Sequence, residues 1–358
     1  MRYYVLIILA MLATMTLRSQ PVTDTEALNL AHRIEDADST QRANLLARLI
    51  DLESFVARMK AETKVMKDHK VEKDVTEGLR PKIGGLAAAV VPPDSFSYRL
   101  LRQYSDDKGA RHLLFRSYSG LAVNYNDILL VRVGDSVKVA DIYIYLSGES
   151  QSEQISGILE TMMMSHATAG EANQQDAIVT QVSTLYEQGQ YGAAKEEFDS
   201  LEPKLQNEKT LQTLNIQICK QIDDFVYESA LDRFGKLFPD APNTYLLKMD
   251  LYYRKGDYPG YEAAIDRLDT IVGIDPWLNL LRGNLMLQEA RWEKALAYYE
   301  KAYAYDSLNV SSVQGLVYAY AKLDKYDAAK KVIAGYRKTA KFREEDIAYL
   351  YGMFPSLQ

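Results

Sequence analysis

The sequence is poor in cysteine, proline, glycine and long hydrophobic runs. Its single cysteine in 358 residues, Cys219, excludes an internal disulfide, and it lies in a helical pattern typical of a small buried residue. The 19 glycines and 10 prolines exclude a collagen-like chain, and the hydrophobic fraction of 47% excludes a disordered one. Roughly two domains are expected from the length.

Sequence signatures of catalysis are also missing. The chain has no Gly-x-Ser-x-Gly elbow, no His-Glu-x-x-His, no glycine-rich phosphate loop and no paired cysteine ligands. The four histidines, His32, His69, His112 and His166, are scattered along the chain, which argues against a histidine metal site. We therefore expect a non-enzymatic protein that binds no cofactor and no metal.

An excess of basic charge is absent as well. The formal net charge is −7, and residues 170–358 carry 22 Lys and Arg against 28 Asp and Glu, a difference of −6. Proteins that bind nucleic acids need a basic surface that neutralises phosphates. We therefore expect no nucleic-acid partner.

Apolar residues do concentrate at the N-terminus. Arg2 precedes the 13-residue run Val5–Leu17, and Arg18 ends it. A membrane-spanning helix needs about 20 apolar residues, whereas a secretory signal peptide needs fewer behind a positive charge. The pattern predicts a signal peptide over residues 1–19, export to the periplasm or the extracellular space, and no membrane span after removal of the signal. An uncleaved membrane anchor is the alternative.

Residues 22–168 are expected to form one α+β domain that opens with helices. Ser39 is the predicted N-cap of one long helix, which carries apolar residues at helical spacing as far as Met59. A shorter helix is expected before it, with Ala27, Leu28, Ala31 and Ile34 on its apolar face. Residues 60–76 are rich in Lys and Glu and are expected to be a solvated helix end or loop. A further helix is predicted to start near Ser152.

Strands are predicted between these helices. Turns at Asp106–Gly109 and at Gly134–Asp135 separate segments that are rich in β-branched and aromatic residues. Short connections require neighbouring strands to be antiparallel, so the fold class is helices on a four-stranded antiparallel meander. The predicted strands are residues 98–104, 110–118, 122–133 and 137–146.

The order of these elements has a family resemblance. Helices followed by a curved antiparallel sheet that ends in Val139–Glu149 are similar to the NTF2-like (SnoaL-type) α+β fold. Gly120–Tyr125, together with that strand, also resembles a module that precedes helical repeats in exported bacterial proteins. A cystatin-like helix on a sheet is the alternative. The resemblance implies a pocket at the wide end of the sheet.

Polar side chains on alternating strand positions would line such a pocket. Asp141 and His112 could act as a general acid–base pair if they lie within hydrogen-bond reach. That arrangement would make the domain an enzyme or a small-molecule-binding protein. Alternatively, Asp141 forms an ion pair with Arg116 at the rim of the sheet, and the tyrosines only pack. The candidate pocket residues are His112, Arg116, Tyr125, Asp141, Tyr143 and Tyr145.

Residues 170–358 contain an internal repeat that is centred on a small residue. Successive alanines are 36, 34, 31 and 34 residues apart, each with an aromatic residue three positions earlier and a bulky residue four positions later. The third repeat has about three extra residues around Pro259, and the second lacks the turn glycine. The alanines are Ala194, Ala230, Ala264, Ala295 and Ala329.

This register resembles the tetratricopeptide repeat (TPR), a helix-turn-helix of 34 residues. The small alanine lets adjacent helices approach closely, and the aromatic and bulky residues fill the space beside it. Gly283 matches the family's small position on a first helix. The resemblance implies an all-α solenoid of about five hairpins with a capping helix near residues 343–353. A generic helical bundle is the alternative.

The resemblance also implies a concave surface, formed by the first helix of each hairpin, that binds a protein partner. The predicted solvent-facing residues on it mix donors, acceptors and aromatic rings. We therefore expect a protein–protein interaction or scaffold protein, and a rigid spacer is the alternative. The predicted partner-binding residues are Asn215, Asp250, Tyr253, Arg254, Asn284, Gln288, Gln314, Tyr318 and Lys322.

Overall fold

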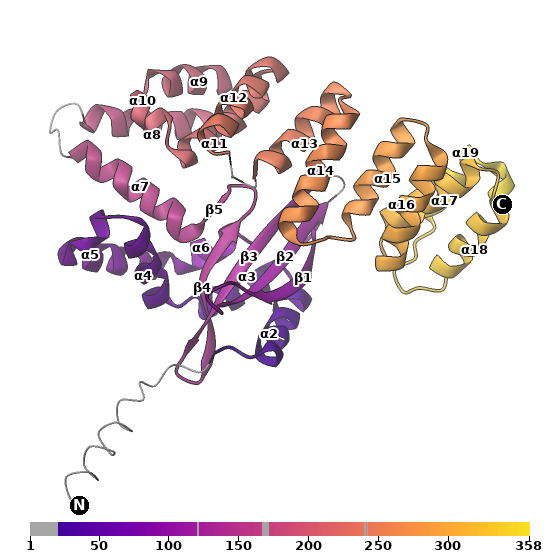
Figure 1. Cartoon of the computed structure of the whole chain (residues 1–358), viewed down its shortest axis with the longest axis horizontal. Helices are drawn as coiled ribbons and strands as arrows, with labels where there is room; N and C mark the ends of the chain where they lie inside the picture. The colour runs from indigo at the N-terminus through magenta and orange to yellow at the C-terminus, as the bar shows by residue number, and fades with distance from the viewer. Residues whose placement is uncertain (1–20, 120–121, 167–171, 240, 242) are drawn as a thin grey trace, which may run out of the picture. The chain divides into compact units, whose positions relative to one another are not determined.

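The computed structural model describes residues 21–119, 122–166, 172–239, 241 and 243–358. The predicted signal peptide over residues 1–19 and the predicted domain boundary at 168–170 lie outside these residues. The described chain divides into two compact units, which we describe separately (Figure 1). The first unit comprises residues 21–119 with 123–214, and the second comprises essentially residues 215–358.

The first unit contains a five-stranded antiparallel sheet whose strands follow one another in chain order (Figure 1). The four predicted strands are confirmed, each within two residues of its expected ends. Only the two-residue strand β5 was not predicted, because so short a segment carries no alternating pattern. The strands are β1 (Ser97–Ser105), β2 (Arg111–Ser119), β3 (Ala122–Val133), β4 (Ser136–Ile144) and β5 (Glu149–Ser150).

Both predicted turns are present. The Asp106 carboxylate accepts hydrogen bonds from the backbone N–H groups of Lys108 at 2.9 Å and Ala110 at 2.8 Å, and Gly109 adopts a φ of 79°. In the second turn Gly134 has a φ of 56°, a left-handed conformation that glycine adopts without steric cost.

The predicted long helix is wrong, because two helices replace it: α3 (Ser39–Leu49) and α4 (Leu52–Glu62). The backbone N–H of Asp51 donates to the carbonyl of Val139 in β4 at 2.8 Å, which takes the chain out of helical geometry. The Asp51 carboxylate then caps α4. The N-cap of α3 is Asp38, not the predicted Ser39.

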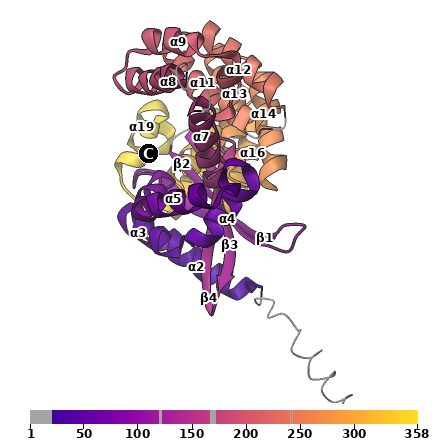
Figure 2. The same ribbon diagram turned by 90° about the vertical axis from the view of Figure 1, so that its left-hand side faces the viewer.

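The helices of this unit up to α7 pack in two groups. The first group covers one face of the sheet with α2 (Asp24–Asp36), which was predicted, α3, and α6 (Ile83–Ala89), which was not (Figure 1 and Figure 2). The second group forms a smaller core from α4, α5 (His69–Leu79) and α7 (Gln151–His166). Helix α5 occupies much of the segment expected to be a solvated helix end or loop, and Asp68 caps it. Two short 3-10 helices, η1 (Val65–Lys67) and η2 (Arg80–Lys82), flank α5.

After the sheet, every described element is helical. Helices α8, α9 and α10 belong to the first unit, α11 begins there, and the rest belong to the second unit (Figure 1). The helices are α8 (Ala172–Glu187), α9 (Tyr191–Ser200), α10 (Pro203–Gln206), α11 (Lys209–Ile222), α12 (Asp224–Leu237), α13 (Asn243–Lys255), α14 (Tyr258–Val272), α15 (Leu278–Gln288), α16 (Trp292–Tyr305), α17 (Val310–Lys322), α18 (Tyr326–Tyr336), α19 (Glu345–Met353) and the 3-10 helix η3 (Pro355–Leu357).

All five repeat alanines are buried, as the register requires, and so are the five bulky residues that follow them. They lie on the second helix of successive pairs, in α9, α12, α14, α16 and α18. The extra residues of the third repeat form an additional turn at the start of α14. Asp257 caps that turn, and Pro259 occupies one of its first positions, where the missing N–H does not matter.

Four of the turns between paired helices share one backbone geometry. In each, a residue with positive φ precedes an N–H that donates to the carbonyl five residues back, at 2.9 Å. Glycine serves at two of these positions, whereas Ala290 with φ 55° and Asp324 with φ 56° serve at the others. The four residues are Gly189, Gly256, Ala290 and Asp324.

Substitution of Ala290 by glycine is expected to stabilise the second unit by about 1 kcal/mol. A residue with a Cβ atom is strained by that order in the left-handed region, and Ala290 is exposed, so no packing is lost. A urea titration followed by tryptophan fluorescence measures this unit, because Trp277 and Trp292 are the chain's only tryptophans. Gly256→Ala is the matched control and should lower the midpoint. A lower midpoint for Ala290→Gly would contradict the strain argument.

Candidate functional site

A histidine lies between two aspartates at one end of the sheet. His112 Nδ1 is 3.1 Å from an oxygen of Asp127, and Nε2 is 3.7 Å from an oxygen of Asp106, beyond hydrogen-bond reach. The Tyr104 hydroxyl donates to the second oxygen of Asp127, and its ring stacks on His112. Burial, followed by the charge of Asp127, raises the pKa of Tyr104, so this hydroxyl keeps its proton. The His112–Asp127 pair therefore replaces the expected pair of His112 with Asp141.

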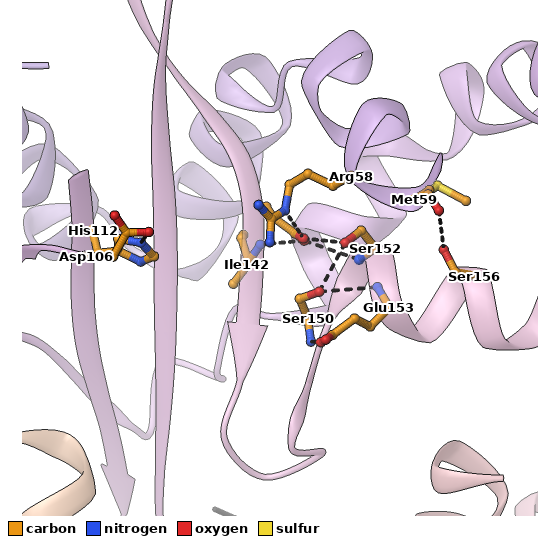
Figure 3. A network of polar contacts seen from close by, with 10 residues as sticks. Arg58, Met59, Asp106, His112, Ile142, Ser150, Ser152, Glu153 and Ser156 are labelled. Atoms are coloured by element: carbon orange, nitrogen blue, oxygen red, sulfur yellow. Dashed lines mark hydrogen bonds and ion pairs between the residues drawn. The ribbon is translucent and has the colours of Figure 1, made fainter. Parts of the chain in front are cut away.

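Asp141 belongs to a different network, which fastens two helices to β4 (Figure 3). Its carboxylate accepts from Arg58 Nε in α4 at 2.8 Å and from both the backbone N–H and the hydroxyl of Ser152 in α7. The alternative expectation of an ion pair with Arg116 is also wrong, because the ionic partner of Asp141 is Arg58. Figure 3 shows His112 and Asp106 apart from the Arg58–Ser152 network.

The other predicted pocket residues are packed side chains. Arg116 and Tyr125 are buried, and the Tyr125 ring meets the edge of Tyr145 at 5.7 Å. Tyr143 lies opposite Asp127 in the β3–β4 pairing. Burial, with a smaller contribution from the charge of Asp127, raises the pKa of Tyr145 to about 12. Tyr143 and Tyr145 thus lie near the Asp127 carboxylate that pairs with His112, whereas Arg116 and Tyr125 are buried side chains.

A cleft of about 430 Å³ lies elsewhere in the first unit, between α3 and α6. None of the six predicted pocket residues lines it. Small side chains dominate its walls, and two prolines also line it. The lining residues are Ser39, Thr40, Ala43, Asn44, Ala47, Gly84, Ala88, Val91, Pro92 and Pro93.

Three of the predicted partner-binding residues serve the fold of the helical region instead. Asn215 is buried, so its expected solvent-facing position is wrong. The side-chain oxygen of Asn284 accepts from the Tyr299 hydroxyl at 2.6 Å. Gln314 donates to the backbone carbonyl of Asp346 in α19 at 2.6 Å, which ties α17 to the C-terminal helix.

Two other predicted residues, Asp250 and Arg254, lie near the end of α13. Asp250 pairs with Lys220 at 3.0 Å and with Arg254 at 3.4 Å. Arg254 also bonds Asp224 at 2.6 Å. Half-exposed ion pairs of this kind add little stability and leave the surface polar.

Tyr253 and Gln288 are exposed at the ends of α13 and α15. The Tyr253 ring packs on Tyr261 with the centroids 5.7 Å apart. These two residues therefore remain available to a partner, although they lie on different helices.

The last two predicted residues, Tyr318 and Lys322, lie in an accessible aromatic cluster that we call the C-terminal aromatic patch. The Tyr318 ring meets the edge of Phe354 at 5.3 Å, and Tyr349 and Met353 of α19 are 47% and 52% exposed. Burial, followed by the neighbouring Tyr318, raises the pKa of Tyr349, so its hydroxyl is a neutral donor at physiological pH. The patch comprises Trp292, Tyr318, Lys322, Tyr349, Met353 and Phe354.

Sequence reasoning found two of the six patch residues. Trp292 was recognised only as the aromatic residue of the fourth repeat, and the C-terminal segment only as a cap. The spacing of Tyr349 and Met353, four residues apart on a helix, was the available signal for an exposed apolar pair.

The described residues offer neither a metal-ion cluster nor a membrane-spanning helix. Among them, no group of three or more metal-ligating side chains is placed to hold an ion, and no described helix is long and apolar enough to cross a bilayer. Comparison of the chain with family models, with curated proteins and with solved structures found no match in any of the three.

Proposed function

We propose that this chain is a non-enzymatic, exported interaction protein in which TPR-like hairpins of residues 170–358 bind a protein partner. Residues 22–168 would act as an NTF2-like domain that orients or docks it. The buried repeat alanines and the shared turn geometry support the TPR-like interpretation. The apolar run at the N-terminus supports export.

The C-terminal aromatic patch is the observation that carries the proposal. Aromatic and methionine side chains supply much of the energy of protein interfaces, because they bury large areas at a small cost in conformational entropy. Here they gather from α16, α17, α19 and the segment that follows α19. The exposed Tyr349 lies close to Tyr318, and the exposed Met353 follows one turn later on α19. An exposed aromatic surface with one lysine is more typical of a protein-binding site than of the hydrated surface of a rigid spacer.

Removal of the two exposed patch residues of α19 is expected to abolish partner capture. An affinity-tagged full chain, cross-linked in the cells that produce it, should enrich a partner that Tyr349→Ala/Met353→Ala loses by at least about tenfold, since central apolar contacts are each worth about 1–2 kcal/mol. The double variant Tyr305→Ala/Leu308→Ala removes an equally exposed apolar pair outside the patch and should retain the partner. Equal capture by wild type and both variants would contradict the proposal.

A second candidate function rests on the His112–Asp127 pair. An imidazole oriented by a carboxylate is the usual arrangement of a general base, and its Nε2 atom makes no hydrogen bond. Small-molecule binding in the first unit would appear as a thermal shift that His112→Ala and Asp127→Asn remove. Ligand responses unchanged in both variants would eliminate this function.

A further inference from the structure

Three aromatic rings from three separate elements surround the ammonium group of Lys322. Its Nζ atom lies 5.3 Å from the ring centroid of Trp292 at the start of α16, 5.4 Å from that of Tyr318 in α17 and 5.7 Å from that of Phe354 after α19. Distances below about 6 Å are those of cation–π attraction. We call these three rings the cage.

The ammonium group of Lys322 is held in the cage by ring contacts alone. Among the described residues, Lys322 has no carboxylate partner, whereas Lys220 and Lys255 pair with Asp250 and Glu228. The lysine is exposed, and the three rings are partly exposed, so solvent reaches the cage. An ammonium on a long flexible stem, held only by rings, can leave without stranding a buried charge.

We propose that the cage is a binding site for the guanidinium group of an arginine in the partner, and that Lys322 is its intramolecular occupant. The inference names the chemistry of the partner in the proposed function and rests on that function. Arginine displaces Lys322, stacks on the rings and places its methylene stem against Met353 and Tyr349. Lys322 is therefore a competitor that weakens partner binding.

Arginine suits this site better than the groups that compete with it. A guanidinium is planar, more weakly hydrated than an ammonium and stacks on aromatic faces, so its transfer to the cage costs less. The negative faces of three rings repel a carboxylate unless Lys322 holds it. The chain's net charge of −7 has the sign that attracts a basic segment.

The test uses the full chain and N-acetyl-arginine amide as the probe, at constant ionic strength. Trp292 fluorescence measures occupancy, since the other tryptophan, Trp277, is buried. Lys322→Ala should bind the probe about fivefold more tightly than wild type, the change expected when an exposed cation–π contact stops competing. Lys322→Met keeps the stem without the charge and should bind between the two.

Matched controls separate the cage from ordinary ring contacts. Lys301 lies 5.5 Å from the single ring of Tyr298, so Lys301→Ala should leave probe affinity unchanged. Phe354→Leu should weaken binding in the Lys322→Ala background. Weaker or equal affinity in both Lys322 variants, or tighter binding of N-acetyl-glutamate amide by wild type, would overturn the proposal. Partner capture by the full chain tests the proposed function separately, so the two failures are distinguishable.

Discussion

Replacement of Gly315 by alanine is expected to lower the free energy of unfolding of the second unit by about 3 kcal/mol, although alanine is the better helix former. A Cβ atom at Gly315 in α17 would lie 2.2 Å from one carbon of the Tyr299 ring and 2.5 Å from another. Contacts that short do not occur between carbon atoms, so the ring or the helix must move.

The Tyr299 ring has no room to move. It is fully buried in α16, and a Cβ atom on Gly283 of α15 would also lie 2.8 Å from it. Its hydroxyl donates to Asn284 at 2.6 Å, which holds the ring in its rotamer. Two glycines on neighbouring helices thus accept one tyrosine, and the added methyl must separate α16 from α17.

Tryptophan-monitored urea unfolding measures the effect, because both tryptophans lie in this unit. Gly335→Ala is the matched control: it is also a helical glycine, but its new Cβ would lie 3.7 Å from the nearest atom, so helix propensity should stabilise it by up to about 1 kcal/mol. In a Tyr299→Leu background the cost of Gly315→Ala should fall below about 1 kcal/mol. Stabilisation by Gly315→Ala in the wild-type background would refute the predicted clash between the added methyl group and the Tyr299 ring.

The repeat register was predictable because it depends on one small position that recurs at a near-constant spacing. Ala295, with Trp292 before it and Tyr299 after it, fits the position where a small side chain lets two helices approach closely. The turns were harder to predict, since Ala290 and Asp324 occupy left-handed positions at which sequence rules expect glycine or asparagine. The requirement for glycine at position 315 could not be predicted, because the Tyr299 ring that it accommodates lies in another helix.

The strands were predictable from alternation and turns, but the partners of their polar residues were not. A bulge between Leu129 and Leu130 shifts the pairing, so Val139 and Ile142 both face the core although an odd number of positions separates them. Asp141 therefore meets Arg58, 83 residues away, and not a neighbour on the sheet. No local pattern in the sequence records which helix packs beside that strand.

Only two of the six residues of the C-terminal aromatic patch were predicted, for the same reason. Tyr318 and Lys322 share one helix, so their i, i+4 spacing predicts contact. Trp292 reaches Lys322 because α16 packs against α17, and Phe354 reaches it because the chain after α19 returns to the end of α17. Contacts between distant elements depend on the tertiary fold, and the sequence alone did not show where the chain after α19 packs.

Replacement of Asp141 by alanine should destabilise the first unit by about 3 kcal/mol. The carboxylate is 3% exposed and accepts from Arg58, from the backbone N–H of Ile142 at 2.9 Å and from Ser152, whose N–H lies 3.2 Å away. Ser152 is fully buried in the first turn of α7, where the helix dipole also favours a negative charge. Alanine leaves the Ser152 groups without an acceptor, and unsatisfied buried donors of this kind cost about 1–3 kcal/mol each.

The network predicts an asymmetry between its two charged members. Arg58 is 42% exposed on its side chain, so Arg58→Ala leaves Asp141 with its buried donors and should cost only about 1 kcal/mol. Hydrogen exchange of peptides from β4 and α7 is the appropriate measurement, because the first unit contains no tryptophan and a two-unit chain need not unfold in one step. Asp141→Ala should accelerate exchange there and leave the tryptophan-monitored transition unchanged. Equal effects of the two variants would mean that the exposed ion pair, rather than the buried hydrogen bonds, joins α7 to the sheet.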